Sequence, residues 1–345
     1  MYGEVRLEEL TLRTAKLHWL RPFAGRARVS CRGKSARLQR AMTDFGIEKS
    51  FASANRQLRE HYGFGLNASA MRTATLQHAQ RAEQLLRAEY EQPYRILPGQ
   101  GEGAAGVILA EADGSMLCTV TEGRVRKGPR PRQWQEIRLL AAQRQGSTQA
   151  TYAATFANVQ EAGQRWAHAA KEAGRALESR IHAVCDGAEW ITLQAREVFG
   201  ADATVLTDYY HVSEYLAAAA PACRPAQPKQ WLHTQQKRLK RGASRQLIEE
   251  LAGQREAPEV AEENSPVRAA HRYLSNRPDT LDYPAAIAAG LPIGSGLIES
   301  AHKHVLQARL KLPGCAWLKS NAESIAQLRV LRSNDRWSDL WPLAA

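Results

Sequence analysis

Three acidic residues occupy positions from which their carboxylates could meet. Asp113 ends the mainly apolar run 107–113, and Asp186 ends a second such run, 181–186. Glu299 follows Gly294-Ser295-Gly296 and opens an amphipathic segment that we expect to form a helix through Lys311. Carboxylates at two strand ends and one helix start can converge at one edge of a sheet. Such a group can hold two divalent cations, as cleavage and joining of phosphodiesters require.

Each acid also has an ordinary explanation. Asp-Gly is a common turn, so Asp113 and Gly114 could link two strands of a hairpin. Asp186 could simply leave a strand, and Glu299 could be a first-turn glutamate favoured by the helix dipole. The combined interpretation is favoured because all three acids follow suitable elements in a suitable order.

A fourth acid lies close to this set. Asp208 follows a predicted strand that ends at Thr207, and His211 lies about one helical turn further on. A histidine there could orient a carboxylate or contact a phosphate. Alternatively, Asp208 starts a helix whose histidine faces the core. Two acids, Asp186 and Asp208, therefore compete as the second metal ligand.

Composition indicates the class of partner. The chain has 345 residues, 44% of them hydrophobic, and a net charge of +12, which favours a polyanion such as DNA. No apolar run approaches the roughly 18–20 residues of a membrane-spanning helix, and the N-terminus lacks a signal-peptide pattern. We therefore expect a cytoplasmic, nucleoid-associated protein without a membrane partner. Its five cysteines are scattered and form no CxxC pair, which argues against a zinc site.

The first hundred residues predict a helical region. Segments 53–61 and 69–86 read as helices around the turn 62–67, with Asn67 or Ser69 as the cap of the second helix. Together they indicate a DNA-binding helix-turn-helix within about 50–90, with Arg72 and Arg81 as DNA contacts. A helical hairpin with a merely solvated polar face is the alternative. Residues 93–106 are rich in Gly and Pro and predict a linker.

From Val107 the pattern changes to strands. We expect strands at 107–113, 115–121, 135–142 and 148–155, a helix at 158–177, and strands at 181–186 and 203–207 around a helix at 190–198. This order predicts an α/β fold with a ribonuclease H-like mixed sheet flanked by helices. A helical insertion follows at 213–290, where helices are expected at 229–251 and 267–276. The expected divisions are 1–100, 101–212, 213–290 and 291–345, the last holding the Glu299 helix and a C-terminal helix.

The segment around Glu299 resembles one known family. Gly294-Ser295-Gly296-Leu297-Ile298-Glu299-Ser300-Ala301 is similar to the GSGxIES segment of bacterial insertion-sequence DDE transposases of the ISKra-type group. The similarity continues through 305–314, Trp317, 321–323 and 328–334. Residues 185–191 resemble the segment of the second catalytic Asp, 111–114 that of the first, and 208–211 an Asp-x-x-His signature. The resemblance covers about residues 1–341.

The resemblance implies a function and its residues. It implies a transposase in which Asp113, Asp186 and Glu299 bind two Mg²⁺ ions, replaceable by Mn²⁺, with Asp208 and His211 as accessory groups. DNA ends and target DNA are the implied partners, and a homo-oligomer is expected because two ends must be brought together. On charge we add further DNA contacts: Lys237, Arg238, Lys240, Arg241, His302, Lys303, Arg309 and Lys311.

Alternatives to these assignments stay open. Trp190, Trp231 and Trp317 could stack on unpaired bases or pack in the core. A nuclease that cuts without joining would carry the same acids, and an inactive DNA-binding relic would keep the basic regions. The chain begins near the point where similarity starts in longer family members, so we expect end recognition to be less complete than the catalytic core.

Overall fold

The computed structural model describes residues 6–15, 19–30, 33–99, 101, 104–123, 128–200 and 203–341. The chain forms two compact units. One contains Met1–Gln92, Met116–Ile137 and His302–Ala345, and the other contains Pro93–Ser115 and Arg138–Ala301. Residues from His302 onward therefore group with the N-terminal helices, whereas we expected 291–345 to complete the sheet domain. Residues 124–132 are rich in arginine and lysine, and this segment lies partly outside the described residues.

A mixed six-stranded sheet supports the second unit. Its strands are β3 (Val107–Val120), β4 (Arg132–Arg144), β5 (Ala150–Thr155), β6 (Arg180–Cys185) and β7 (Thr204–Thr207), in the order β5-β4-β3-β6-β7. The short β8 (Trp317–Leu318) pairs with the far end of β3, in the part of β3 that belongs to the first unit. β4 runs antiparallel to β5, whereas β6 is parallel to both β3 and β7. The expected mixed sheet is confirmed.

The expected break between two strands at Asp113 and Gly114 is wrong, and so is the alternative that these two residues form a hairpin turn. Residues 107–120 form one unbroken strand, so Asp113 and Gly114 lie in its middle instead of in a turn. The reason is tertiary. The first half of β3 pairs with β6, from Val107↔Arg180 to Glu111↔Val184, and its last residues pair with β8. Because each half has its own partner, the two halves do not need to fold back on each other.

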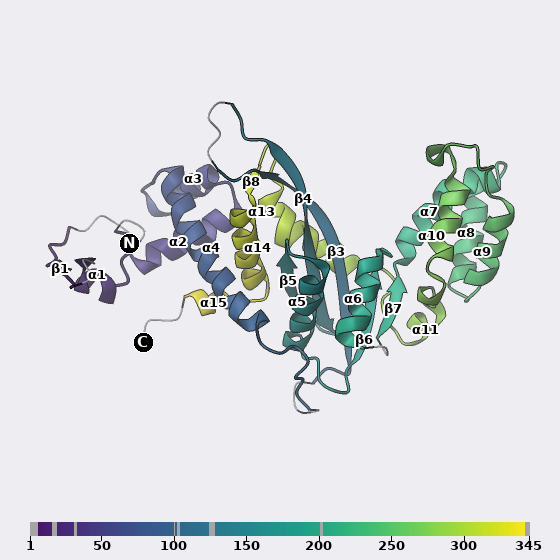
Figure 1. Ribbon diagram of the computed structural model, residues 1–345, viewed down its shortest axis with the longest axis horizontal. Coiled ribbons are helices and arrows are strands. Elements are labelled where there is room, and N and C mark those ends of the chain that lie inside the picture. Colours follow the sequence, from purple (N-terminus) through teal and green to yellow (C-terminus); the bar gives the residue numbers. More distant parts are fainter. Residues whose placement is uncertain are drawn as a thin grey trace. The chain divides into compact units, whose positions relative to one another are not determined.

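Two helices cover the sheet in the second unit. α5 (Val159–Glu172) and α6 (Glu189–Phe199) pack on each other, and they also contact β5 and β6 respectively (Figure 1). Asn158 caps α5 by accepting a hydrogen bond from the Glu161 N–H at 2.9 Å. Trp166 is fully buried, and its indole N–H donates to the Ala141 carbonyl of β4 at 3.0 Å. The core of the unit thus lies between this helical layer and the sheet.

The insertion is helical, as expected. It contains α7 (Tyr209–Cys223), α8 (Pro228–Leu239), α9 (Ser244–Gly253), η1 (Glu262–Asn264), α10 (Pro266–Ser275), η2 (Pro278–Thr280) and α11 (Tyr283–Ala288). The helical stretch expected over 229–251 consists of two helices, because the chain turns at Gly242, whose φ is +83°. Leu216, Leu239, Leu251, Leu274 and Tyr283 form a common apolar core.

The first unit is built mainly from helices. α2 (Ala36–Glu48), α3 (Phe51–Tyr62) and α4 (Ala68–Tyr90) pack around Met42, Leu58 and Met71, and α14 (Lys319–Ser333) packs along α4. The expected pair of helices is confirmed as α3 and α4, and Asn67 is the cap, accepting from the Ala70 N–H at 2.7 Å. The remaining elements are short: β1 (Leu12–Arg13), β2 (Trp19–Leu20), α1 (Pro22–Arg26) and α15 (Trp337–Leu340).

The expected Glu299 helix is present but is not uniform. It begins as α12 (Gly296–Ala301), widens into the π-helical turns of η3 (His302–Gln307) and ends as α13 (Ala308–Leu310). Insertions of this kind in helices often accompany functional sites. Among the helices that the structure describes, none is both long and apolar enough to cross a membrane.

Candidate metal centre

Three aspartates lie on one level of the sheet. The β3–β6 ladder pairs Glu111 with Val184, an offset of 184 − 111 = 73 residues, and 186 − 113 is also 73. The β6–β7 ladder pairs Cys185 with Thr207, an offset of 22, and 208 − 186 is also 22. Asp186 directly follows β6 and Asp208 directly follows β7, so both registers, continued by one or two residues, place them at the level of Asp113 in β3. Parallel strands at equal register present their side chains to the same face of a sheet.

Asp208 is the most enclosed of the three. It is fully buried at the start of α7, where its Oδ1 accepts hydrogen bonds from the backbone N–H groups of Tyr210 at 2.5 Å and His211 at 3.3 Å. Its Oδ2 accepts from the Ser295 N–H at 2.6 Å and from the Ser295 hydroxyl. A carboxylate has about four acceptor positions, and all four are used. Asp208 is therefore a structural link between β7 and the loop before Glu299.

That loop is held closely against α7. The Tyr209 N–H donates to the Ile293 carbonyl at 2.9 Å, next to the bonds from Ser295 to Asp208. A Cβ atom at Gly294 would lie 2.6 Å from the ring of Tyr210, closer than real Cβ contacts come. The first glycine of the Gly-Ser-Gly segment is thus required by this approach.

Glu111 contacts the segment before Glu299 at the start of α12. It lies on β3, two residues before Asp113, and is 2% exposed. Its Oε2 accepts a hydrogen bond from the Ile298 N–H in the first turn of α12 at 2.8 Å. Burial is the main cause that raises the pKa of Glu111 to about 8, and the nearby charges of Asp208 and Glu299 contribute to this rise, against the lowering effect of the backbone N–H groups. Glu111 thus caps the helix that carries Glu299.

Glu299 is exposed and directly follows the segment that Asp208 and Glu111 hold by hydrogen bonds. One ligand atom from each of Asp208, His211 and Glu299 lies within 4.8 Å of the other two. His211 is half-buried, and its Nδ1 lies 3.9 Å from a carboxylate oxygen of Glu214. The structure therefore brings Glu299 together with the residues expected to be accessory, and Asp113 and Asp186 are not members of this group.

Asp186 sits in a turn that the insertion fixes. Its Oδ1 accepts from the Ala188 N–H at 2.9 Å, and its backbone carbonyl accepts from the hydroxyl of Tyr273 in α10. The neighbouring Gly187 carbonyl accepts from Nε of Arg277 at 2.7 Å. Gly187 has a φ of +87°, and a Cβ there would lie 2.3 Å from that same nitrogen. Helix α10 therefore defines the position of the second predicted acid.

The donor atoms fit a hard divalent cation. Asp113 and Asp186 are partly exposed, and Glu299 is exposed, so each can offer carboxylate oxygen to Mg²⁺ or Mn²⁺. His211 adds a nitrogen donor, which suits Mn²⁺ better than Mg²⁺. Asp208 fits direct ligation less well, because a metal would have to displace one of its four hydrogen bonds.

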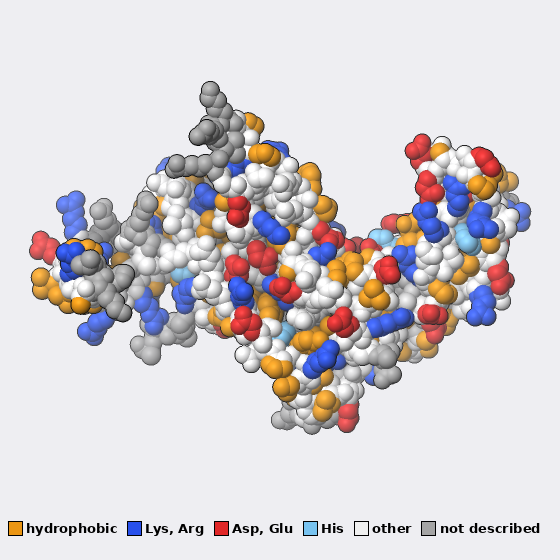
Figure 2. All heavy atoms as spheres, viewed as in Figure 1, with side chains coloured by type: hydrophobic (Ala, Val, Ile, Leu, Met, Phe, Trp, Pro, Cys, Tyr) orange, Lys and Arg blue, Asp and Glu red, His pale blue; other side chains and the backbone are white. Residues whose placement is uncertain are grey.

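The predicted DNA contacts divide by burial. Arg72, Arg81, Lys237, Lys240, Arg241, Lys303 and Lys311 are exposed, and several of the Lys and Arg side chains on the viewed face lie over the insertion helices (Figure 2). Arg238 is half-buried in an ion pair with Glu250 at 2.5 Å. Lys240 lies over the ring of Tyr209, 4.6 Å from its centroid.

Two expected DNA contacts are corrected by the structure. Arg309 is 2% exposed: its Nε donates to the Gly46 carbonyl at 2.9 Å, and its guanidinium lies between the rings of Phe51 and Trp317. His302 is also buried, at 4%. Both lie on the inward face of the helical segment after Glu299, which charge alone could not reveal. Trp231 and Trp317 are likewise buried. Trp190 is half-buried, and the Arg138 guanidinium lies 5.3 Å from its ring centroid.

Two residues that build this centre are not distinguished by the sequence pattern. Ser295 stands out only as part of the Gly-Ser-Gly segment, and Glu111 only as a neighbour of Asp113. The alternation of β3 carried a signal for Glu111, because residues two apart share a face of a strand. Searches against protein-family models and against curated proteins return no match for this chain.

Proposed function

We propose that this protein is a DDE-type transposase with a ribonuclease H-like catalytic unit, which cleaves DNA at element ends and joins it to target DNA. The observation that carries the proposal is the shared sheet level of Asp113, Asp186 and Asp208, with Glu299 delivered beside Asp208. The strand order, with a mixed sheet and an inserted helical region before the last acid, supports it.

The acids take different roles in this proposal. Asp113, Asp186 and Glu299 hold two Mg²⁺ ions, for which Mn²⁺ can substitute. When bound, the metal lowers the pKa of the attacking water or 3′-hydroxyl and stabilises the leaving oxygen. Asp208 and Glu111 act through the backbone by fixing the segment that precedes Glu299. His211 belongs to the same group as Asp208 and Glu299, and it orients a carboxylate or contacts the scissile phosphate.

DNA is the proposed partner because of the charge and its distribution. The chain carries +12, and exposed basic side chains occur both on α4 and on the insertion helices. Helices α3 and α4 would read DNA as a helix-turn-helix. Action in the cytoplasm at the nucleoid, as a homo-oligomer that holds two DNA ends, belongs to the same proposal.

The direct test is a cleavage and joining assay. Purified protein is mixed with labelled duplexes that carry the DNA flanking its gene, a target plasmid, and Mg²⁺ or Mn²⁺. Asp113→Asn, Asp186→Asn and Glu299→Gln are run beside Glu178→Gln, which changes an exposed acid outside the group of Asp208, His211 and Glu299 and serves as the matched control. We expect metal-dependent nicks and joined products, reduced at least about 100-fold in the three variants and unchanged in the control.

Other outcomes separate the alternatives. Nicks without joining would indicate a nuclease. DNA binding with no cleavage by any protein would indicate an inactive DNA-binding relic. If Asp208→Asn, but not Asp186→Asn, abolished cleavage of a correctly folded protein, the second metal ligand would be Asp208.

A further inference from the structure

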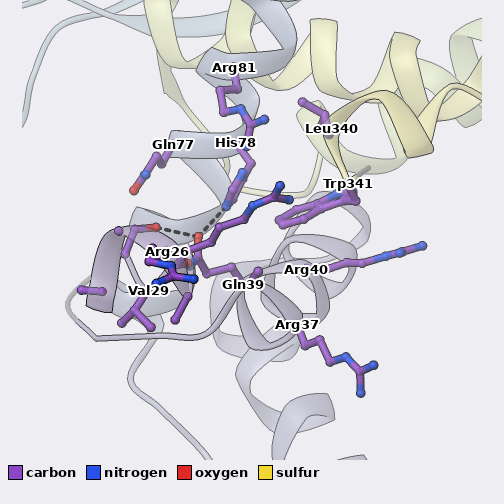
Figure 3. A pocket seen from close by; sticks show the side chains of 16 residues that line it. Arg26, Val29, Arg37, Gln39, Arg40, Gln77, His78, Arg81, Leu340 and Trp341 are labelled. Atoms are coloured by element: carbon purple, nitrogen blue, oxygen red, sulfur yellow. Dashed lines mark hydrogen bonds between the residues drawn. The ribbon is translucent and has the colours of Figure 1, made fainter. Parts of the chain in front are cut away.

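The N-terminal unit contains a large pocket whose lining is strongly basic. Its volume is about 1180 Å³, and α1, the segment that follows it, α2, α4 and α15 contribute to it (Figure 3). Five arginines line it, namely Arg26, Arg28, Arg37, Arg40 and Arg81. Of the described residues that line it, none is acidic. Only Arg81 was singled out from the sequence, because the other four lie before the predicted helix-turn-helix.

A buried glutamine organises the pocket wall. Gln39 is 2% exposed, and its Oε1 faces the Ser30 hydroxyl and Nε2 of His78, each at 2.9 Å. Its Nε2 donates to the Lys34 carbonyl at 2.7 Å. These bonds tie the segment after α1 to α2 and α4. Figure 3 shows the hydrogen bond between Gln39 and His78 among the lining side chains. The pocket is thus a built feature of the fold.

The arginines are available to a ligand. All five are exposed, and in the part of the chain that the structure describes none of them pairs with a carboxylate. From Leu10 to Thr43 the sequence contains no acidic residue at all. Like charges gathered around one cavity repel each other, and an anion that enters the cavity relieves this repulsion. His78 does not add to the charge near pH 7, because burial and Arg81 lower its pKa to about 4.

The exposed face of α4 leads into this pocket. Ser69, Arg72, Thr73, Gln77 and Gln80 line a shallower groove of about 360 Å³, and Gln77 also lines the arginine pocket. Hydroxyl, amide and guanidinium groups are those that pair with base edges in the major groove. The arginine pocket meets α4 near its middle, at Gln77, His78 and Arg81. A helix with this row of polar groups beside a cluster of arginines can contact base edges with the row and phosphates with the arginines.

We infer that the arginine pocket binds the phosphate backbone of double-stranded DNA, on the strand adjacent to the major groove that α4 enters. The inference rests on the proposed function for its choice of DNA. It assigns sequence-independent affinity and sequence discrimination to two different surfaces. The pocket supplies affinity without sequence preference, and the Gln77 and Gln80 row supplies sequence discrimination.

The test measures binding and needs no catalysis. Fluorescence anisotropy with a labelled random-sequence 20-base-pair duplex gives Kd between 50 and 300 mM NaCl for the full chain. Arg37→Gln/Arg40→Gln is compared with Arg87→Gln/Arg255→Gln, which removes the same charge from exposed positions outside the pocket. We expect the pocket variant to bind about tenfold more weakly near 100 mM salt. For this variant, the slope of log Kd against log salt concentration should be smaller by nearly 2, because each lost phosphate contact lowers that slope by about 0.9.

Two further variants serve as controls for folding and for the site of the effect. Arg37→Lys/Arg40→Lys keeps the charge and should retain most of the slope, which a folding defect would not allow. Gln84→Ala changes an exposed residue of α4 that lines neither the arginine pocket nor the groove, and it should leave random-duplex binding unchanged.

Equal slopes for the pocket and control variants would overturn the inference, even if the protein cleaves DNA. A slope that falls only in the pocket variant would support it, even if no cleavage is ever seen. Tighter binding of a 20-nucleotide RNA than of the duplex would overturn the assignment to DNA.

Discussion

The carboxylate of Glu111 and the backbone N–H of Ile298 form a buried hydrogen bond of 2.8 Å across 187 residues of sequence. Ile298 immediately precedes Glu299, and Glu111 is two residues from Asp113. One bond therefore couples the central strand to the helix that carries the last predicted acid. Asp208 makes the equivalent link on the other side, through Ser295. The geometry of the centre depends on these two buried acids as much as on the acids expected to bind metal.

Removing the Glu111 acceptor should destabilise the second unit. Glu111→Ala leaves the Ile298 N–H buried without its partner, and such a loss costs about 1–3 kcal/mol in the free energy of unfolding. Glu111→Gln keeps an acceptor oxygen, so we expect a loss of less than about 1 kcal/mol. Urea unfolding at pH 7 measures both. Equal destabilisation by the two substitutions would show that the hydrogen bond is not what Glu111 contributes.

Gly294 should not tolerate a side chain. Gly294→Ala places a methyl group 2.6 Å from the Tyr210 ring, and we expect it to destabilise the protein by about 1–3 kcal/mol and to lower cleavage. Gly296→Ala is the matched control, because nothing lies within 4 Å of a Cβ there. Tyr210 is exposed, so Tyr210→Ala should restore most of the stability of Gly294→Ala. Thermal unfolding of the three single variants and the double variant gives the coupling; additive effects would refute the steric explanation.

His78 should make stability depend on pH. Its pKa is lowered from 6.5 to about 4 by burial and by Arg81, so the folded state favours the neutral ring. This contribution is complete above pH 6.5 and is lost as the pH falls towards 4, because the unfolded chain takes up the proton first. We expect the wild-type protein to lose about 2 kcal/mol more than His78→Gln between pH 7.5 and pH 5. Parallel pH profiles for the two proteins would contradict the shift.

Local patterns determined most of the elements. The helices α3 and α4, the capping by Asn67, the strands β6 and β7 and the helical nature of 209–288 follow from periodicity and from turn residues, which act over a few neighbours. The elements that local patterns predict incorrectly are those whose extent depends on pairing with segments distant in sequence. β3 continues through Asp113 because β6 and β8 pair with its two ends, and neither strand is close in sequence.

The candidate functional residues can be read from the chain alone, as can the order of Asp113, Asp186, Asp208 and Glu299, the basic charge and the Gly-Ser-Gly segment. Which of these residues lie close together depends on the folded state. Sheet register set the common level of the three aspartates, and the burial of Glu111 and Asp208 gave them backbone N–H groups to hold. Arg309 and His302 are buried and are therefore not available at the surface for contact with DNA. Charge and spacing are properties of the chain, whereas register, enclosure and shared hydrogen bonds arise only when distant segments pack.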